Sequence, residues 1–131
     1  SNMNNEWLDF KKWISYIRSK VILIEGNHDI IPAEYYKEIG VEVFEKLETG
    51  NFLFTHHPME ADGFFNFSGH IHPGVMMKGV GRQRIRLSCF FKTETGMILP
   101  AFGNFTGKHI LQPAKTDEVF AIAEGKVIRV L

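Results

Sequence analysis

The sequence is poor in the features that mark secreted, membrane-bound and polybasic proteins. Cys89 is the only cysteine, so no internal disulfide can form and a reducing compartment is allowed. The formal net charge is zero, with 15 Lys and Arg residues against 15 Asp and Glu residues, which argues against a histone-like partner mode. No apolar run approaches the ~20 residues of a membrane span, and no signal peptide is recognisable, so we expect a cytoplasmic protein with no membrane partner.

The composition is that of a folded, strand-rich domain. Of the 131 residues, 44% are apolar, which is enough for a hydrophobic core and too many for a disordered tail. The 12 Phe and 12 Gly residues favour strands and tight turns over a helical bundle. Ser1 and Asn2 resemble a tag remnant ahead of Met3, and the length fits a single domain over residues 3–131.

The first third of the chain alternates helix and strand. Apolar residues at helical spacing predict a first helix; they are Trp7, Phe10, Ile14 and Ile17. The unbroken apolar run Val21–Ile24 predicts a strand buried on both faces of a parallel sheet. Pro32 can open a short second helix, and Gly40 can end it.

Short strands dominate the rest of the chain. Apolar runs and alternating patterns predict them at Val41–Phe44, Phe52–Thr55 and residues 64–67, 84–91 and 97–102, with a closing hairpin of residues 119–123 and 127–131. We therefore expect an α/β layered fold with an antiparallel second half.

Five of the six histidines lie in three short segments, and each segment directly follows a predicted strand. The segments are residues 26–29, 56–58 and 69–73. Ligands of open α/β sheets bind just beyond the carboxyl ends of the strands, so these clusters can converge on one point. A single histidine is more often a hydrogen-bonded core or surface residue. Three post-strand clusters together predict a site for a divalent metal such as Mn, Fe, Zn or Ni.

These motifs resemble those of the calcineurin-like metallophosphoesterases. Gly26-Asn27-His28-Asp29, His56-His57-Pro58 and Gly69-His70-Ile71-His72 are similar, in order and spacing, to the last three motifs of that superfamily. The chain is most similar to the ligase-associated DNA-damage-response endonuclease group, and the similarity covers nearly its whole length. Further support comes from Asn5-Glu6-Trp7, His72-Pro73-Gly74-Val75, Arg82-Gln83 and the segment of residues 99–107.

The resemblance implies a phosphoester hydrolase that clamps a phosphate between two cations, Mn in the intact family. Its motifs assign Asn27, His56 and His70 to one metal and His72 to the other. They make His28 the catalytic residue that contacts the phosphate, with Asp29 orienting it. His57 is set aside, because family ligands tend to lie two residues before the proline. The substrate is a phosphoester, with DNA as one candidate and DNA repair as the setting.

Two earlier motifs of the family, Asp-x-His and Gly-Asp, do not occur in this chain. The implied fold is thus a partial metallophosphoesterase β-sandwich flanked by helices, with its first βαβ segment missing. We expect the isolated chain to be weak or inactive, with metal sites empty or partly occupied. The bare edge of the strand at Val21–Ile24 predicts a homodimer. The alternatives are a non-catalytic remnant that binds a nucleic acid or protein partner, and a missing segment supplied by another chain or by upstream coding sequence.

Two further segments are candidates for substrate binding. Arg82, Arg84 and Arg86 are expected on one face of a strand, where they form either a phosphate-backbone stripe or simply a solvated face. The loop at residues 102–107 offers Asn104 and Thr106 to a substrate, or is only a tight turn between strands. With Arg82, these two residues complete the predicted substrate-binding set.

Overall fold

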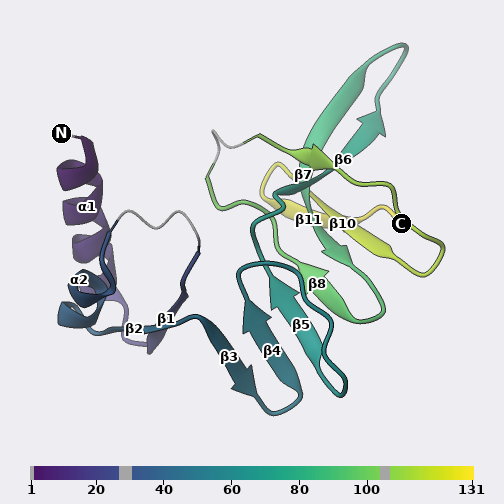
Figure 1. Cartoon of the computed structure of the whole chain (residues 1–131). Coiled ribbons are helices and arrows are strands. Elements are labelled where there is room, and N and C mark those ends of the chain that lie inside the picture. Colours follow the sequence, from purple (N-terminus) through teal and green to yellow (C-terminus); the bar gives the residue numbers. More distant parts are fainter. Residues whose placement is uncertain (1, 27–30, 104–106) are drawn as a thin grey trace. The chain divides into compact units, whose positions relative to one another are not determined.

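The computed structural model describes residues 2–26, 31–103 and 107–131 (Figure 1). Their contacts divide the chain into two compact units, residues 1–45 and residues 46–131. Within the described ranges, no helix has the length and apolar character needed to cross a membrane.

The first unit pairs two helices with two parallel strands. It contains α1 (Asn2–Tyr16), β1 (Val21–Ile24), α2 (Ala33–Glu38) and β2 (Val41–Phe44). The Trp7 ring lies edge-on to the Tyr36 ring, with centroids 5.2 Å apart, so aromatic packing joins α1 to α2. Val21 pairs with Val41 and Ile24 with Phe44, which confirms the parallel pairing expected of the apolar run.

The expectation that both faces of β1 are buried is wrong. Ile22 is 39% exposed, whereas Val21 and Leu23 are half-buried. Ile22 is the one exposed residue of β1, since Ile24 is half-buried as well, and its exposure is what contradicts full burial of both faces. Among the described residues β1 pairs with β2 alone, and its other edge is the one on which the predicted homodimer depends.

The second unit consists of strands, which are β3 (Lys46–Thr49), β4 (Phe52–Thr55), β5 (Phe65–Ser68), β6 (Pro73–Lys78), β7 (Arg84–Lys92), β8 (Gly96–Ile98), β9 (His109–Ile110), β10 (Glu118–Ala123) and β11 (Lys126–Arg129). Their order is β11-β10-β7-β8-β5-β4-β3, and β6 pairs with β7 and β9. The chain is thus an α/β protein of the β-sandwich type with few helices, which confirms the predicted fold class.

The expected antiparallel second half is only partly correct. β4 and β5 are parallel, as are β5 and β8 and also β6 and β9. The reason is the connection: the chain leaves β5, makes the antiparallel β6–β7 pair, and returns to β8 beside β5 in the same direction. The closing hairpin is confirmed, since Glu124 and Gly125 both have positive φ and join β10 to β11 as a two-residue loop.

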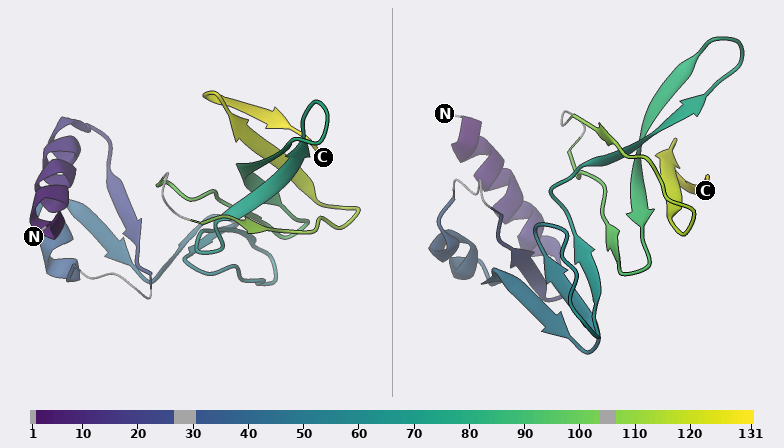
Figure 2. Two further views of the ribbon diagram at one scale, coloured as in Figure 1. Left: turned by 90° about the horizontal axis from the view of Figure 1, so that it is seen from above. Right: turned by 45° about the vertical axis from the view of Figure 1, so that its right-hand side comes forward.

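β7 belongs to two layers at once (Figure 2). Its residues 84–88 pair with β6, whereas residues 89–92 pair with β10. Where the strand changes partners, Cys89, Phe91 and Val119 form a buried cluster. Burial raises the pKa of the Cys89 thiol to about 11, so this cysteine is a packing residue rather than a nucleophile.

Gly96 allows β8 to lie close against β5. A Cβ atom at this position would lie 2.5 Å from the main-chain oxygen of Asn66, a distance at which the backbone has to shift. The close pairing of these two strands therefore depends on the missing side chain.

We expect Gly96→Ala to lower the free energy of unfolding by about 1–3 kcal/mol, because the added methyl group forces β8 away from β5. Urea denaturation followed by far-ultraviolet circular dichroism measures the loss, because both tryptophans, Trp7 and Trp13, lie in the other unit. Gly107→Ala is the matched control, since a Cβ there meets open space. Equal stability of the two variants would show that β5 and β8 do not require the glycine.

Candidate metal centre

The parallel pairing of β4 and β5 brings two histidine segments to one edge of the sheet. Thr55 is the register partner of Ser68, so the next residues on each strand, His56 and Gly69, emerge together. The Gly69 amide donates to the His56 carbonyl at 3.0 Å, which extends the pairing by one step beyond both strands. His70 therefore leaves the sheet beside His56.

Three imidazoles meet at this edge, and we call His56, His57 and His70 the histidine group. One nitrogen from each ring lies within 4.8 Å of the others. Nε2 of His56 is 3.1 Å from Nδ1 of His70, and the His57 and His70 ring centroids are 4.1 Å apart. His70 is exposed and His56 is half-buried, so the group is accessible from solvent.

The backbone of residues 69–72 takes conformations that are rare for residues other than glycine. His70 has φ 67° and His72 has φ 56°. The Ile71 amide donates to the Gly69 carbonyl at 2.8 Å, which closes a three-residue turn around His70. Such conformations cost about 1–3 kcal/mol each and gather at functional sites. The turn directs His70 toward His56 instead of continuing the strand.

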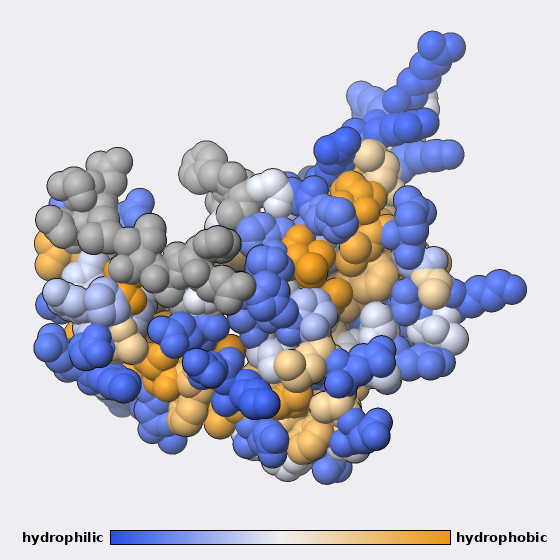
Figure 3. Space-filling view, in the orientation of Figure 1, coloured by the Kyte–Doolittle hydropathy of each residue, from blue (hydrophilic) through white to orange (hydrophobic). Residues whose placement is uncertain are grey.

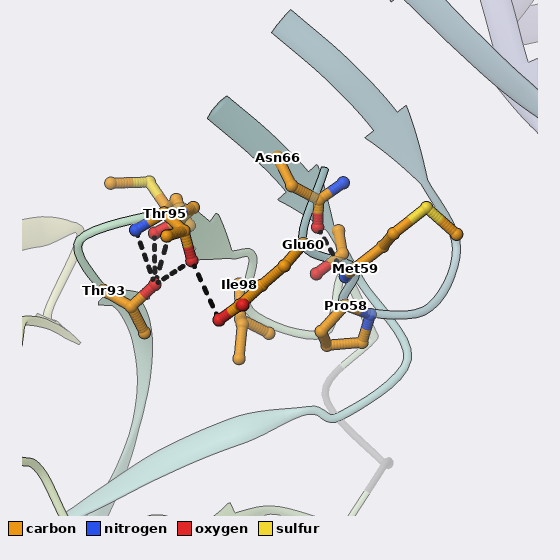
Figure 4. Close-up of a pocket in the computed structure, with 10 residues that line it drawn as sticks. Pro58, Met59, Glu60, Asn66, Thr93, Thr95 and Ile98 are labelled. Carbon is orange, nitrogen blue, oxygen red and sulfur yellow. Dashed lines mark hydrogen bonds between the residues drawn. The ribbon is translucent and has the colours of Figure 1, made fainter. Parts of the chain in front are cut away.

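A buried amide holds the segment that carries His57. Asn66 is 4% exposed and donates to the Leu53 carbonyl and to Thr55 Oγ1, both at 2.9 Å. Its Oδ1 accepts from the Met59 amide at 3.0 Å (Figure 4). Thr55 in turn donates to the His57 carbonyl. Both ends of the segment 57–59 are therefore fixed by side chains from the sheet.

A small pocket lies between this segment and β8 (Figure 4). Its volume is about 200 Å³, and no member of the histidine group lines it. Thr93 and Thr95 lie on one side, where Thr95 Oγ1 is 3.5 Å from Glu60 Oε1. Ser68 also lines the pocket, and its buried hydroxyl has no hydrogen-bond partner among the described residues.

The histidine group fits a divalent cation. Ligand nitrogens around a tetrahedral Zn ion with bonds of about 2.0–2.1 Å lie roughly 3.3–3.4 Å from one another. The separation of 3.1 Å between His56 Nε2 and His70 Nδ1 is close to that value, and a nitrogen of His57 lies within 4.8 Å of both. The group contains no carboxylate among the described residues, and neutral imidazoles suit Zn or Ni better than Mg.

The structure places the predicted site residues in three ways. His56 and His70 converge as predicted, and His57, which sequence reasoning set aside, lies with them; its position beside His56 was the available signal. His72 does not belong to the group of histidines whose ring nitrogens lie within 4.8 Å of one another. Asn27, His28, Asp29, Asn104 and Thr106 lie outside the described residues.

Arg82 does not share a strand face with Arg84 and Arg86. β7 begins at Arg84, and Arg82 lies in the loop before it. The reason is the turn: Gly81 has φ 74°, and the Gly79 amide donates to the Gln83 carbonyl at 2.8 Å, which closes the loop around Arg82.

Comparisons with known proteins find a likeness among the solved structures. No family model and no curated protein matches the chain. Among solved structures, the crystal structure of the Pseudomonas putida nuclease MPE is similar, with a TM-score of 0.75 and 29% sequence identity over 96% of this chain. The chain spans 60% of the length of that nuclease chain.

We expect Asn66→Ala to lower the free energy of unfolding by at least about 2 kcal/mol, because it leaves several buried partners without their hydrogen bonds. Urea denaturation measures the change. Asn51→Ala, at an exposed turn position, is the control and should cost less than about 0.5 kcal/mol. A loss at Asn66 no larger than the control would mean that the amide does not hold the segment.

Proposed function

We propose that the chain is a metal-dependent phosphodiester hydrolase domain of the calcineurin-like metallophosphoesterase type, and that it acts as a nuclease. The observation that carries the proposal is the histidine group at the carboxyl ends of two parallel strands. The likeness to the Pseudomonas putida nuclease, at 29% identity, supports the same class of reaction. DNA as the natural substrate and DNA repair as the setting rest on the motif resemblance.

Imidazole nitrogens of His56, His57 and His70 would hold the cation. A bound divalent cation supplies Lewis-acid stabilisation of the charge that develops on a phosphoryl oxygen. This chain contributes by holding the ligands in position: the turn around His70 and the hydrogen bonds of Asn66 and Thr55 fix the backbone that carries the three imidazoles. A donor set held in place in this way loses little freedom on binding.

The remaining assignments stay predictions from the sequence. They are His28 as the group that contacts the phosphate, Asp29 as its orienting partner, Asn27 and His72 as further ligands, and Arg82, Asn104 and Thr106 toward the substrate. His72 has a fixed backbone: its carbonyl accepts from the His109 amide at 2.8 Å, where β9 begins beside β6.

The second candidate function is non-catalytic binding of a nucleic acid or protein partner. The observation that favours it is the absence of a carboxylate from the histidine group within the described ranges. Neutral donors alone do not offset the charge of two dications. The two candidates differ in one measurable property, which is turnover of a simple phosphodiester.

We expect the chain to bind Zn²⁺ through the histidine group, and His70→Ala to weaken the affinity by at least about tenfold because a ligand is lost. Isothermal titration calorimetry with Zn²⁺, Ni²⁺ and Mn²⁺ measures it, with His56→Ala and His57→Ala separating the two neighbouring histidines. His109→Ala is the control, since His109 is exposed and outside the group.

Hydrolysis of bis-p-nitrophenyl phosphate in the presence of each metal then decides between the candidates. Turnover that disappears in His70→Ala supports the hydrolase. Metal binding without turnover supports the non-catalytic alternative. Equal metal affinity in the wild type and all three histidine variants contradicts both uses of the site.

A further inference from the structure

The β6–β7 hairpin carries a group of cations that the histidine group does not use. We call β6, residues 84–88 of β7 and the connecting loop of residues 79–83 the basic ribbon. The sequence from Gly63 to Thr93 contains no Asp or Glu, yet it contains Lys78, Arg82, Arg84 and Arg86. All four are exposed. In a chain of zero net charge, this is a strong local separation of charge.

The strand register places three of these cations on one face. Lys78 lies directly opposite Arg84, and Met76 lies opposite Arg86. Directly opposed residues of an antiparallel pair point to the same side, as do residues two apart on one strand. Lys78, Arg84 and Arg86 therefore share a face. Met77 and Ile85 take the other face, which leads toward Val75 and Cys89 at the buried core.

This arrangement is unfavourable for the isolated ribbon. Like charges placed directly opposite each other destabilise a sheet, and an ordinary solvated face would intersperse both signs. At the other end of β7 the cations have an acidic partner, because Lys92 and Arg129 both pair with Glu118, at 3.1 and 2.9 Å. Within residues 2–26, 31–103 and 107–131, no ion pair involves the four cations of the ribbon.

The ribbon also projects away from the rest of its unit (Figures 1 and 2). Hydrophilic side chains predominate at its outer end in the space-filling view (Figure 3). The connecting loop contains Arg82 and also Val80, which is 92% exposed. The hydrogen bond from Gly79 to Gln83 closes that loop. The cations are thus presented on an ordered two-stranded element that a large partner can reach from several sides.

We propose that the basic ribbon is a docking surface for the phosphate backbone of a nucleic acid. Closely spaced cations with no neutralising acids attract a polyanion and release its counterions, and a two-stranded antiparallel ribbon is a shape that the DNA major groove accepts. Arg adds planar, bidentate pairing with phosphate. The substrate class rests on the proposed function, whereas the charge pattern that carries the docking surface is independent of it.

The ribbon is connected directly to the metal centre. β6 begins at Pro73, immediately after His72, and Lys78 lies six residues beyond His72, or roughly 20 Å along an extended strand. The ribbon thus begins three residues after His70, the member of the histidine group that precedes it in the sequence.

The test is binding of the full chain to a labelled 20-nucleotide DNA, single-stranded and as a duplex, by fluorescence anisotropy in EDTA, so that no metal is bound and no hydrolysis occurs. We expect the wild-type affinity to fall steeply with salt, with a slope of roughly −2 to −3 in log K against log[salt]. The triple variant K78Q/R84Q/R86Q should bind at least about tenfold more weakly and lose most of that slope.

The matched control removes three exposed lysines elsewhere in the same unit, as K46Q/K115Q/K126Q. An equal loss of affinity in both triple variants would show that overall charge alone is responsible, and would overturn the proposal. So would a wild-type slope shallower than about −1, a measurement that needs no variant and is immune to misfolding. R84K/R86K keeps the charge and should retain most of the binding.

Two further readouts separate the possible sources of failure. Binding of the wild type to vesicles of phosphatidylserine and phosphatidylcholine, without binding to DNA, would assign the ribbon to a membrane surface and overturn the proposal. The affinity for Zn²⁺, measured by isothermal titration calorimetry, should be the same in K78Q/R84Q/R86Q as in the wild type, because the histidine group lies outside the ribbon. Loss of DNA binding with this affinity retained therefore supports the ribbon's role independently of the metal centre.

Discussion

The parallel register between β4 and β5 is the constraint on which the candidate site depends. Because Thr55 is aligned with Ser68, the residues that follow both strands emerge at the same height, and the histidines meet without any long loop to position them. Asn66 secures this alignment from inside the sheet, since one amide bonds to both β4 and the segment beyond it. Gly96 then permits β8 to close on the other side of β5. The positions of the histidines are thus set by the pairing of the strands in the sheet.

The two ends of β7 carry charge differently: one end has ion pairs, and the other carries the cations of the basic ribbon. At the end near β10, Glu118 forms ion pairs with Lys92 and Arg129, and the strand contributes Cys89 and Phe91 to the buried cluster with Val119. At the other end the cations are not offset in the described structure, and the apolar face of the hairpin provides the packing. Residues 89–92 of β7 therefore contribute to folding, whereas residues 84–88 are available for a partner of opposite charge.

Sequence patterns predicted the elements whose signals are local. The apolar run Val21–Ile24 and the Glu124-Gly125 turn were identified because a single strand or hairpin explains each of them. β6 was missed because it begins with Pro73-Gly74, which is typical of a turn, and β9 because two residues carry no pattern. For the site, strand ends correctly predicted that His56 and His70 converge. The inclusion of His57 depends on the hydrogen bonds of Asn66 and Thr55, which no spacing rule contains.

β7 runs without a break from the buried cluster at Cys89 to the exposed loop at Arg82. One end of the strand is held by its pairing with β10, and the other end carries the loop of the hairpin. A bound partner that pulls on the hairpin loop is opposed by the pairing of residues 89–92 with β10. The bending stress then acts where β7 changes partners, between residues 88 and 89. The buried cluster of Cys89, Phe91 and Val119 therefore anchors the hairpin whose loop lies farthest along β7 from it.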